Sequence, residues 1–144
     1  MKPSKLMIGF LTVLVLFGLV GCSGAEPVSI EKYKWNLHTV QSGNDGAVIA
    51  CSEDNMDVYP GADAMMMSCT AKDGGLAITD TTNDKTYTGT YKRVKASPES
   101  ILYEFMIGEE TGSAVSAMTV YHDESKKPTL ILTIGGYALH FYAE

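Results

Sequence analysis

Hydrophobic and polar residues alternate with a period of two along most of the chain after residue 33. The alternating runs are rich in Tyr, Val, Ile and Thr and are separated by Gly, Asn, Asp and Pro, a pattern typical of β-strands joined by turns. The sequence therefore predicts an all-β fold. The predicted strands cover residues 33–40, 47–51, 64–70, 76–80, 85–92, 99–107, 114–121, 129–134 and 137–142.

The connections between these strands are mostly short. Gly135-Gly136 alone joins the last two strands, and two glycines accept the positive φ angles of a tight hairpin. The longest connection, residues 52–63, is acidic and irregular, while residues 108–112 are predicted to form a loop and residues 123–128 a charged turn. Eight or nine sequential strands indicate one small antiparallel meander over residues 30–144, which closes into a barrel or, as the alternative, folds as a β-sandwich.

The N-terminus has a different pattern. Lys2 and Lys5 precede an apolar run over residues 6–20, which is the layout of a secretory signal. A run of this length reaches roughly 22 Å as a helix, short of the ~30 Å hydrocarbon core of a bilayer. A permanent membrane span is therefore the weaker interpretation. The run ends in the four residues Leu19-Val20-Gly21-Cys22.

This ending resembles the lipobox of bacterial lipoproteins. The resemblance implies that the Cys22 thiol receives a diacylglycerol and that the chain is cut between Gly21 and Cys22. Two acyl chains hold a protein stably at a membrane, where one does not. We therefore expect residues 1–21 to be a signal peptide, residues 22–29 a lipidated tether, and the domain to lie on the extracytoplasmic face of a cell membrane or outer membrane. An ordinary cleaved signal that ends in cysteine by chance is the alternative.

The charge of the expected mature chain limits its partners. Loss of residues 1–21 removes Lys2 and Lys5 from 11 basic residues, which leaves 9 against 17 acidic residues and a net charge of −8. This acidity argues against electrostatic binding of nucleic acid or of anionic headgroups.

Two cysteines remain after lipidation, Cys51 and Cys69. Export places them where thiols can be oxidised, so a disulfide between them is the simplest interpretation. Closing a loop of this length contributes about 3 kcal/mol in the chain-entropy model. Two buried thiols that act as small hydrophobic groups are the alternative.

A Trp in the first strand, a meander of about eight strands and an aromatic C-terminal strand together resemble a small lipocalin-like barrel. The match departs from the family where Tyr33, rather than glycine, stands two positions before Trp35, and where no long helix follows the barrel. The resemblance implies a small apolar ligand inside the barrel and a structural role for Trp35 across the closed end. The aromatic residues predicted to face inward are Tyr33, Trp35, Tyr87, Tyr91, Tyr103, Phe105, Tyr121, Tyr137 and Phe141, of which Trp35, Tyr87, Tyr91, Tyr103, Phe105, Tyr121 and Phe141 are the candidate ligand-lining set.

Metal and catalytic sites find little support in the sequence. Residues 52–63 lack the ligand order of a calcium loop. Consecutive methionines, Met65 to Met67, point to opposite faces of a strand and would not converge on one ion. A closed barrel would bring His38 beside His140, but zinc needs at least one more ligand. No hydrolase, metalloprotease or phosphate-loop motif is present, so we expect no enzyme, metal or cofactor.

These patterns favour a non-enzymatic, membrane-anchored lipoprotein that binds a small apolar or amphipathic ligand. One alternative is an envelope module with a packed core that contacts or inhibits a protein partner. Another is an accessory subunit of a neighbouring transporter. An empty aromatic-lined barrel would favour the ligand, and a filled barrel with an exposed apolar patch would favour a protein partner.

Overall fold

The computed structural model describes residues 28–120 and 123–144. The predicted signal peptide, residues 22–27 of the predicted tether with Cys22, and Tyr121 lie outside the described residues. Within the described residues, no helix has the length and hydropathy that a membrane span requires. The strands are β1 (Trp35–Ser42), β2 (Val48–Cys51), β3 (Asp63–Ala64), β4 (Met67–Lys72), β5 (Gly75–Asp80), β6 (Lys85–Ala96), β7 (Ser100–Ile107), β8 (Glu110–Val120), β9 (Lys126–Ile134) and β10 (Tyr137–Ala143), with a 3-10 turn η1 (Glu53–Asn55) between β2 and β3.

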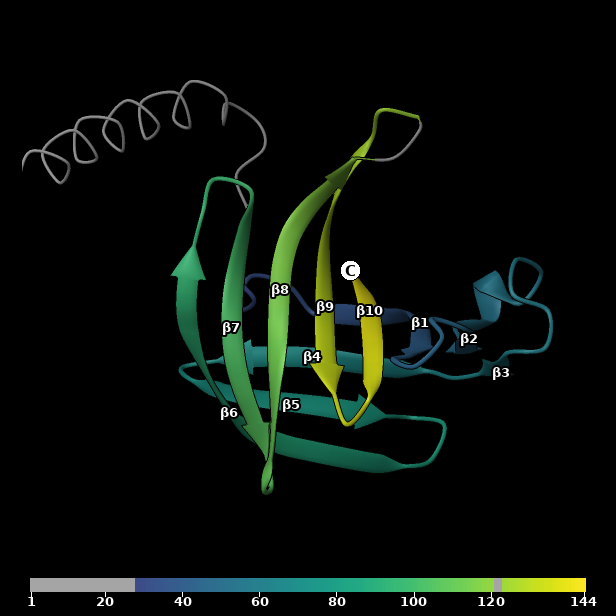
Figure 1. The fold of residues 1–144 in the computed structure, drawn as a ribbon, viewed down its shortest axis with the longest axis horizontal. Helices are drawn as coiled ribbons and strands as arrows, with labels where there is room; N and C mark the ends of the chain where they lie inside the picture. Colours follow the sequence, from purple (N-terminus) through teal and green to yellow (C-terminus); the bar gives the residue numbers. More distant parts are fainter. Residues whose placement is uncertain (1–27, 121–122) are drawn as a thin grey trace, which may run out of the picture.

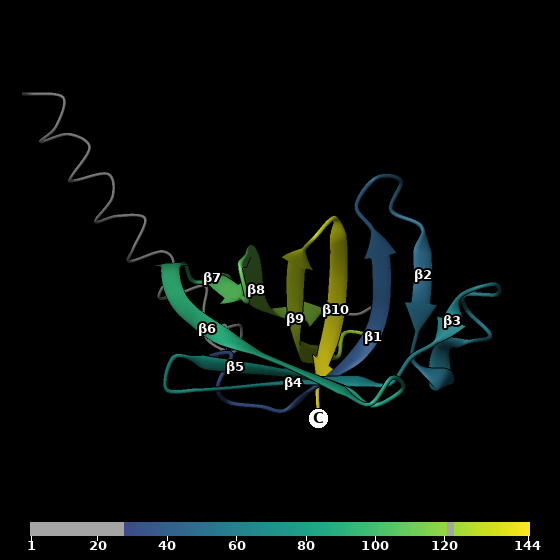
Figure 2. The ribbon, with the colours of Figure 1, turned by 90° about the horizontal axis from the view of Figure 1, so that it is seen from below.

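Eight of these strands form a closed antiparallel barrel (Figures 1 and 2). The strands from β4 to β10 pair in sequential order, and β1 pairs with both β4 and β10. The closing seam runs from Trp35 opposite Ala143 to Ser42 opposite Tyr137. This pairing confirms the predicted all-β barrel and excludes the β-sandwich alternative.

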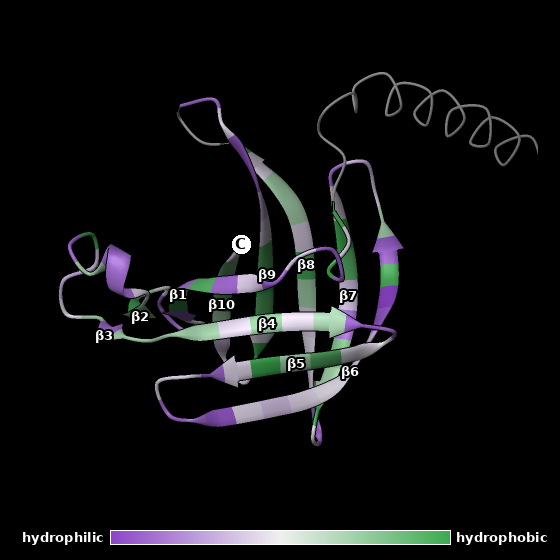
Figure 3. Cartoon of the chain, turned by 180° about the vertical axis from the view of Figure 1, so that it is seen from behind, coloured by the Kyte–Doolittle hydropathy of each residue, from purple (hydrophilic) through white to green (hydrophobic). Residues whose placement is uncertain are grey.

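A side lobe, residues 43–66, interrupts the barrel between β1 and β4. It contains β2, η1 and β3, and Figure 1 shows these elements projecting from one side of the barrel. β2 is antiparallel to β1, whereas β3 is a two-residue strand parallel to β2. Figure 3 colours η1 as hydrophilic and much of β5 as hydrophobic, in keeping with an exposed lobe beside a packed barrel. The predicted strand over residues 64–70 is thus two separate strands, β3 and β4.

Side chains of the barrel strands fill its interior. Trp35 and Phe141 are fully buried and Phe105 is 2% exposed, so protein atoms cover almost the whole surface of each ring. Alternation along each strand explains this packing, because every second residue points inward. The apolar residues buried in this core are Ile30, Trp35, Leu37, Val40, Ala50, Cys69, Ala71, Leu76, Ile78, Ile101, Tyr103, Phe105, Ala114, Leu130, Leu132 and Phe141.

The segment before β1 packs into one end of the barrel. Ile30 is fully buried, its N–H donates to the Tyr103 hydroxyl oxygen (3.1 Å), and its carbonyl oxygen accepts from Trp35 Nε1 (2.8 Å). Both backbone polar groups of Ile30 are thereby satisfied away from water, as burial requires. Trp35 therefore has a structural role at this end, as the lipocalin resemblance implies.

Four of the aromatic residues predicted to face inward are buried: Trp35, Tyr103, Phe105 and Phe141. Tyr33 and Tyr91 are half-buried and pack against the core. Tyr87 and Tyr137 are 42% and 47% exposed, so their predicted burial is wrong. Both lie near strand ends: β7 pairs with β6 only from Gly89 onward, and Tyr137 directly follows the Gly135-Gly136 turn.

The predicted loop over residues 108–112 is also wrong in extent. The turn is confined to Gly108 and Glu109, and β8 begins at Glu110. Gly112 lies within β8 opposite Phe105, and a Cβ atom there would come within 2.5 Å of the Phe105 ring. Glycine is needed here for the space that the ring occupies, rather than for a turn.

The predicted turn over residues 123–128 also ends earlier, because β9 begins at Lys126. Pro128 lies in β9 opposite Met118. β10 pairs with β9 only as far as Thr129, so a residue without an N–H is tolerated one position earlier.

Candidate functional site

A β-bulge in β1 directs His38 out of the barrel wall. The register between β1 and β10 shifts between Leu37 and Thr39, so that Leu37 faces Phe141 and Thr39 faces His140. His38 is the extra residue, and its carbonyl oxygen accepts a hydrogen bond from the Ser52 N–H (3.0 Å) of the side lobe. Bulges of this kind re-aim side chains and occur often beside functional sites.

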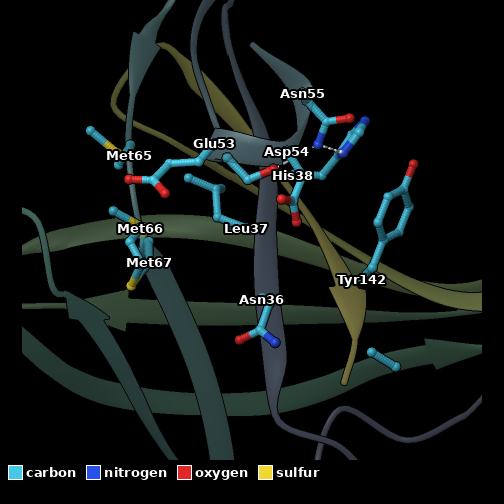
Figure 4. A pocket seen from close by; sticks show the side chains of 12 residues that line it. Asn36, Leu37, His38, Glu53, Asp54, Asn55, Met65, Met66, Met67 and Tyr142 are labelled. Atoms are coloured by element: carbon cyan, nitrogen blue, oxygen red, sulfur yellow. Dashed lines mark hydrogen bonds between the residues drawn. The ribbon is translucent and has the colours of Figure 1, made fainter. Parts of the chain in front are cut away.

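A groove of about 550 Å³ lies where the side lobe meets the outer wall of the barrel. Figure 4 shows the methionines on one side of the groove, His38 and Tyr142 on the other, and Glu53 and Asp54 between them. The barrel contributes the wall and the lobe contributes the acidic side. The lining residues are Asn36, Leu37, His38, Ser52, Glu53, Asp54, Asn55, Met65, Met66, Met67, Tyr142 and Ala143.

Contacts on three sides hold the imidazole of His38. Asn55 Nδ2 lies 2.9 Å from His38 Nδ1 and also donates to Ser52 Oγ (2.6 Å). The Tyr142 ring is tilted against the imidazole at a centroid distance of 4.5 Å, and Tyr59 meets it edge-on at 6.2 Å. Because an amide nitrogen only donates, Nδ1 accepts and the proton of the neutral ring lies on Nε2.

The surroundings of His38 favour its neutral form. Burial lowers the pKa of His38 below its usual value, and the nearby His140 lowers it further. Burial also lowers the pKa of His140, whose Nε2 lies 3.0 Å from Gln41 Oε1. Barrel closure places His140 opposite Thr39, the residue after His38 in the chain. Among the described residues, no three His, Cys, Asp or Glu side chains are grouped as metal ligands would be.

The charge of the groove is negative. Glu53 and Asp54 are exposed in η1, and no Lys or Arg occurs from residue 35 to residue 71. The rest of the lining consists of the polar Asn36, Ser52 and Asn55, two rings and apolar residues. Among the apolar residues, Met65 and Met67 are half-buried and Met66 is 56% exposed. The groove therefore combines carboxylates, rings and thioethers within one hollow.

The two cysteines are free and buried in the structure, which differs from the predicted disulfide. Cys69 lies opposite Trp35 and Cys51 opposite Thr39 along β1. Because Trp35 and Thr39 are four residues apart along β1, the Cα atoms of the two cysteines lie roughly 10 Å or more apart. A disulfide needs a Cα–Cα distance of about 7 Å or less. Burial raises the pKa of Cys69 to about 12, and Cys51 Sγ lies 3.5 Å from Met56 Sδ. The structure thus has the other arrangement that the sequence leaves open, two buried thiols.

Of the residues predicted to line a ligand site, none that the structure describes lines the groove. Trp35, Tyr103, Phe105 and Phe141 belong to the packed core, and Tyr121 lies outside the described residues. The sequence does contain signals of the groove: the acidic residues 52–63 and the methionines that come after them. It gives no sign of the bulge at His38, which depends on the pairing of β1 with β10.

Comparison with known proteins adds no relative. No protein-family model matches the chain, and no curated protein or solved structure is significantly similar to it. A function for this chain has to be inferred from the chemistry of the groove itself.

Proposed function

We propose that this chain is a non-enzymatic, extracytoplasmic lipoprotein, anchored through Cys22, that binds a small amphipathic ligand in the groove beside its barrel. The barrel serves as a rigid scaffold in this proposal. It holds the wall residues His38 and Tyr142 in place, while the side lobe supplies the opposite side of the groove.

The single observation that carries the ligand proposal is the contrast between the barrel interior and the groove. The interior aromatic rings are covered by protein atoms, whereas the groove of about 550 Å³ is open to solvent and has a mixed lining. Small-molecule sites are typically hollows of ~300–1,000 Å³ with mainly apolar walls and a few placed polar groups. The groove has this size, and it combines apolar side chains with the polar groups of Ser52, Glu53 and Asp54.

The anchor is tested by replacing Cys22 with alanine. Without the thiol no diacylglycerol can be attached, so we expect the variant to accumulate as uncut precursor or to leave the membrane fraction. Fractionation of cells followed by mass spectrometry of the N-terminus measures both. Ser23→Ala is the matched control and should be anchored normally. Normal cleavage together with full membrane retention of Cys22→Ala would contradict the anchor.

The groove is tested by NMR of the full protein labelled with [¹³C-methyl]methionine, with phosphatidylcholine nanodiscs present to hold the anchor. We expect 2-phenylethanol, a neutral amphipathic probe, to shift the signals of Met65, Met66 and Met67, because these residues line the groove. Met106 and Met118 lie on β7 and β8 and serve as internal controls that should not shift.

A matched pair of variants locates this binding. Asn36 is exposed on β1 and lines the groove, so Asn36→Trp should fill it and abolish the shifts. Ser113 is exposed on β8, outside the groove lining, so Ser113→Trp should leave the shifts unchanged. Shifts that survive Asn36→Trp, or that spread equally to Met106 and Met118, would contradict binding in the groove.

A second candidate function is a protein-interaction module, including an inhibitor or an accessory subunit of a transporter. One observation favours it: Ile49, Val58 and Met66 of the side lobe are 42%, 65% and 56% exposed. A contiguous exposed apolar patch is typical of protein contact sites, and these three residues would contribute to one. If no small probe shifts the three groove methionines, this candidate becomes the better one.

A further inference from the structure

We infer that the ligand of the groove is an organic cation, an ammonium group joined to an apolar part. The inference rests on the proposed function, because it names the chemical class of ligand for the same groove. It is based on three properties of the lining: its uncompensated carboxylates, its aromatic wall and its thioethers.

The carboxylates of Glu53 and Asp54 have no cationic neighbour in the groove. The lining contains no Lys or Arg, and the ion pairs found among the described residues join Lys34 to Glu144 and Lys92 to Glu104, none of which lines the groove. The wider lobe adds Asp45, Asp57 and Asp63 and again no Lys or Arg. A positively charged ligand would be attracted to this groove, and an anionic one would be repelled.

The aromatic wall is suited to a cation. The rings of His38 and Tyr142 lie together at 4.5 Å, and both line the groove. The lowered pKa of His38 keeps the imidazole neutral near pH 7, so it adds no opposing positive charge. An ammonium group over the face of a tyrosine ring is attracted by the ring quadrupole.

The methionines supply the apolar part of the site. Met65 to Met67 stand on the side of the groove opposite the rings in Figure 4, and Leu37 lies between the two sides. Thioether side chains are flexible and polarisable, so they adapt to apolar groups of different shapes. The groove thus offers carboxylates for a charged head and thioethers for an apolar tail.

The test compares three probes that share a phenyl tail and differ in charge: phenethylamine, 2-phenylethanol and 3-phenylpropionate. The full protein with labelled methionines is titrated with each in phosphatidylcholine nanodiscs at neutral pH. We expect the Met65 to Met67 signals to respond to phenethylamine with about fivefold higher affinity than to 2-phenylethanol. The anion 3-phenylpropionate should bind more weakly than both.

Variants in the lobe identify the source of this preference. Glu53→Gln with Asp54→Asn should reduce the affinity for phenethylamine to that of 2-phenylethanol and leave 2-phenylethanol unchanged. Asp84→Asn with Glu109→Gln removes the same charge from two exposed turns outside the groove lining and should preserve the preference.

The outcomes separate this inference from the proposed function. Equal affinity for all three probes would agree with an amphipathic site and would overturn the inference that its ligand is a cation. No shift of Met65 to Met67 with any probe would overturn both. A preference that persists in the Glu53 and Asp54 variant would also overturn the inference, because the charge of these carboxylates is its cause.

Discussion

Trp35→Ala is expected to lower the free energy of unfolding by about 3–5 kcal/mol, the range for truncating a buried tryptophan. Trp35 is fully buried, its Nε1 donates to the carbonyl oxygen of Ile30, and its ring meets Tyr33 edge-on at 5.8 Å. Its loss would leave a cavity at the end of the barrel and an unsatisfied buried carbonyl group. Urea denaturation followed by far-ultraviolet circular dichroism measures the change.

Two further variants make this prediction specific. Tyr87 has the same predicted inward position in the sequence pattern but is 42% exposed, so Tyr87→Ala should cost less than about 1 kcal/mol. Trp35→Phe keeps most of the ring volume and removes the N–H donor, so it should cost about 1–3 kcal/mol, mainly for the unpaired Ile30 carbonyl. Equal losses for Trp35→Ala and Tyr87→Ala would contradict the packing described for this end of the barrel.

The barrel is largely predictable from the sequence because strands have the simplest periodicity. Alternation correctly identifies Trp35, Tyr103, Phe105 and Phe141 as inward residues, and all four are buried. The Gly135-Gly136 hairpin fixes the register of β9 and β10, with Tyr137 opposite Ile134. Sequential antiparallel pairing alone would leave one unpaired edge on the first strand and one on the last. Pairing these two strands with each other closes the barrel and removes both free edges.

Errors arise where alternation alone cannot decide. Tyr87 and Tyr91 are four residues apart on β6, so both point to the same face of the sheet. Only Tyr91 has a residue of β7 beside it, Phe105. Alternation predicts which face of the sheet a side chain points to. It does not predict how far the side chain lies from the rim of the barrel, which depends on where the neighbouring strands end. Gly112 shows a second limit, because a glycine that makes room for a ring has the same sequence appearance as one that makes a turn.

The groove could not be assembled from the sequence for a related reason. The sequence pattern predicts that Met65 to Met67 alternate along a strand, yet Met65 and Met66 lie between β3 and β4, outside both strands. All three therefore line the same groove. His38 is aimed by a bulge in the pairing of β1 with β10, and its carbonyl oxygen accepts a hydrogen bond from Ser52 of the side lobe. Long-range pairing, and not local pattern, builds this site.

Gly89→Ala is expected to destabilise the protein by about 3 kcal/mol or more, at the upper end of overpacking substitutions. Gly89 lies in β6 between Leu76 of β5 and Ile107 of β7. A Cβ atom there would lie 2.0 Å from the carbonyl oxygen of Met106. The Met106 backbone cannot move away from this Cβ atom without breaking the pairing between β6 and β7. The steric strain would therefore remain in the folded protein.

Gly75→Ala is the matched control, since it makes the same chemical change where space allows. A Cβ at Gly75 would lie 3.3 Å from the Lys72 carbonyl oxygen, a contact that a small shift relieves. Its cost should therefore stay within about 1 kcal/mol of zero, because the alanine also restricts the unfolded chain. Urea unfolding of both variants gives the comparison. Similar stabilities would contradict the close approach of β6 and β7 at Gly89.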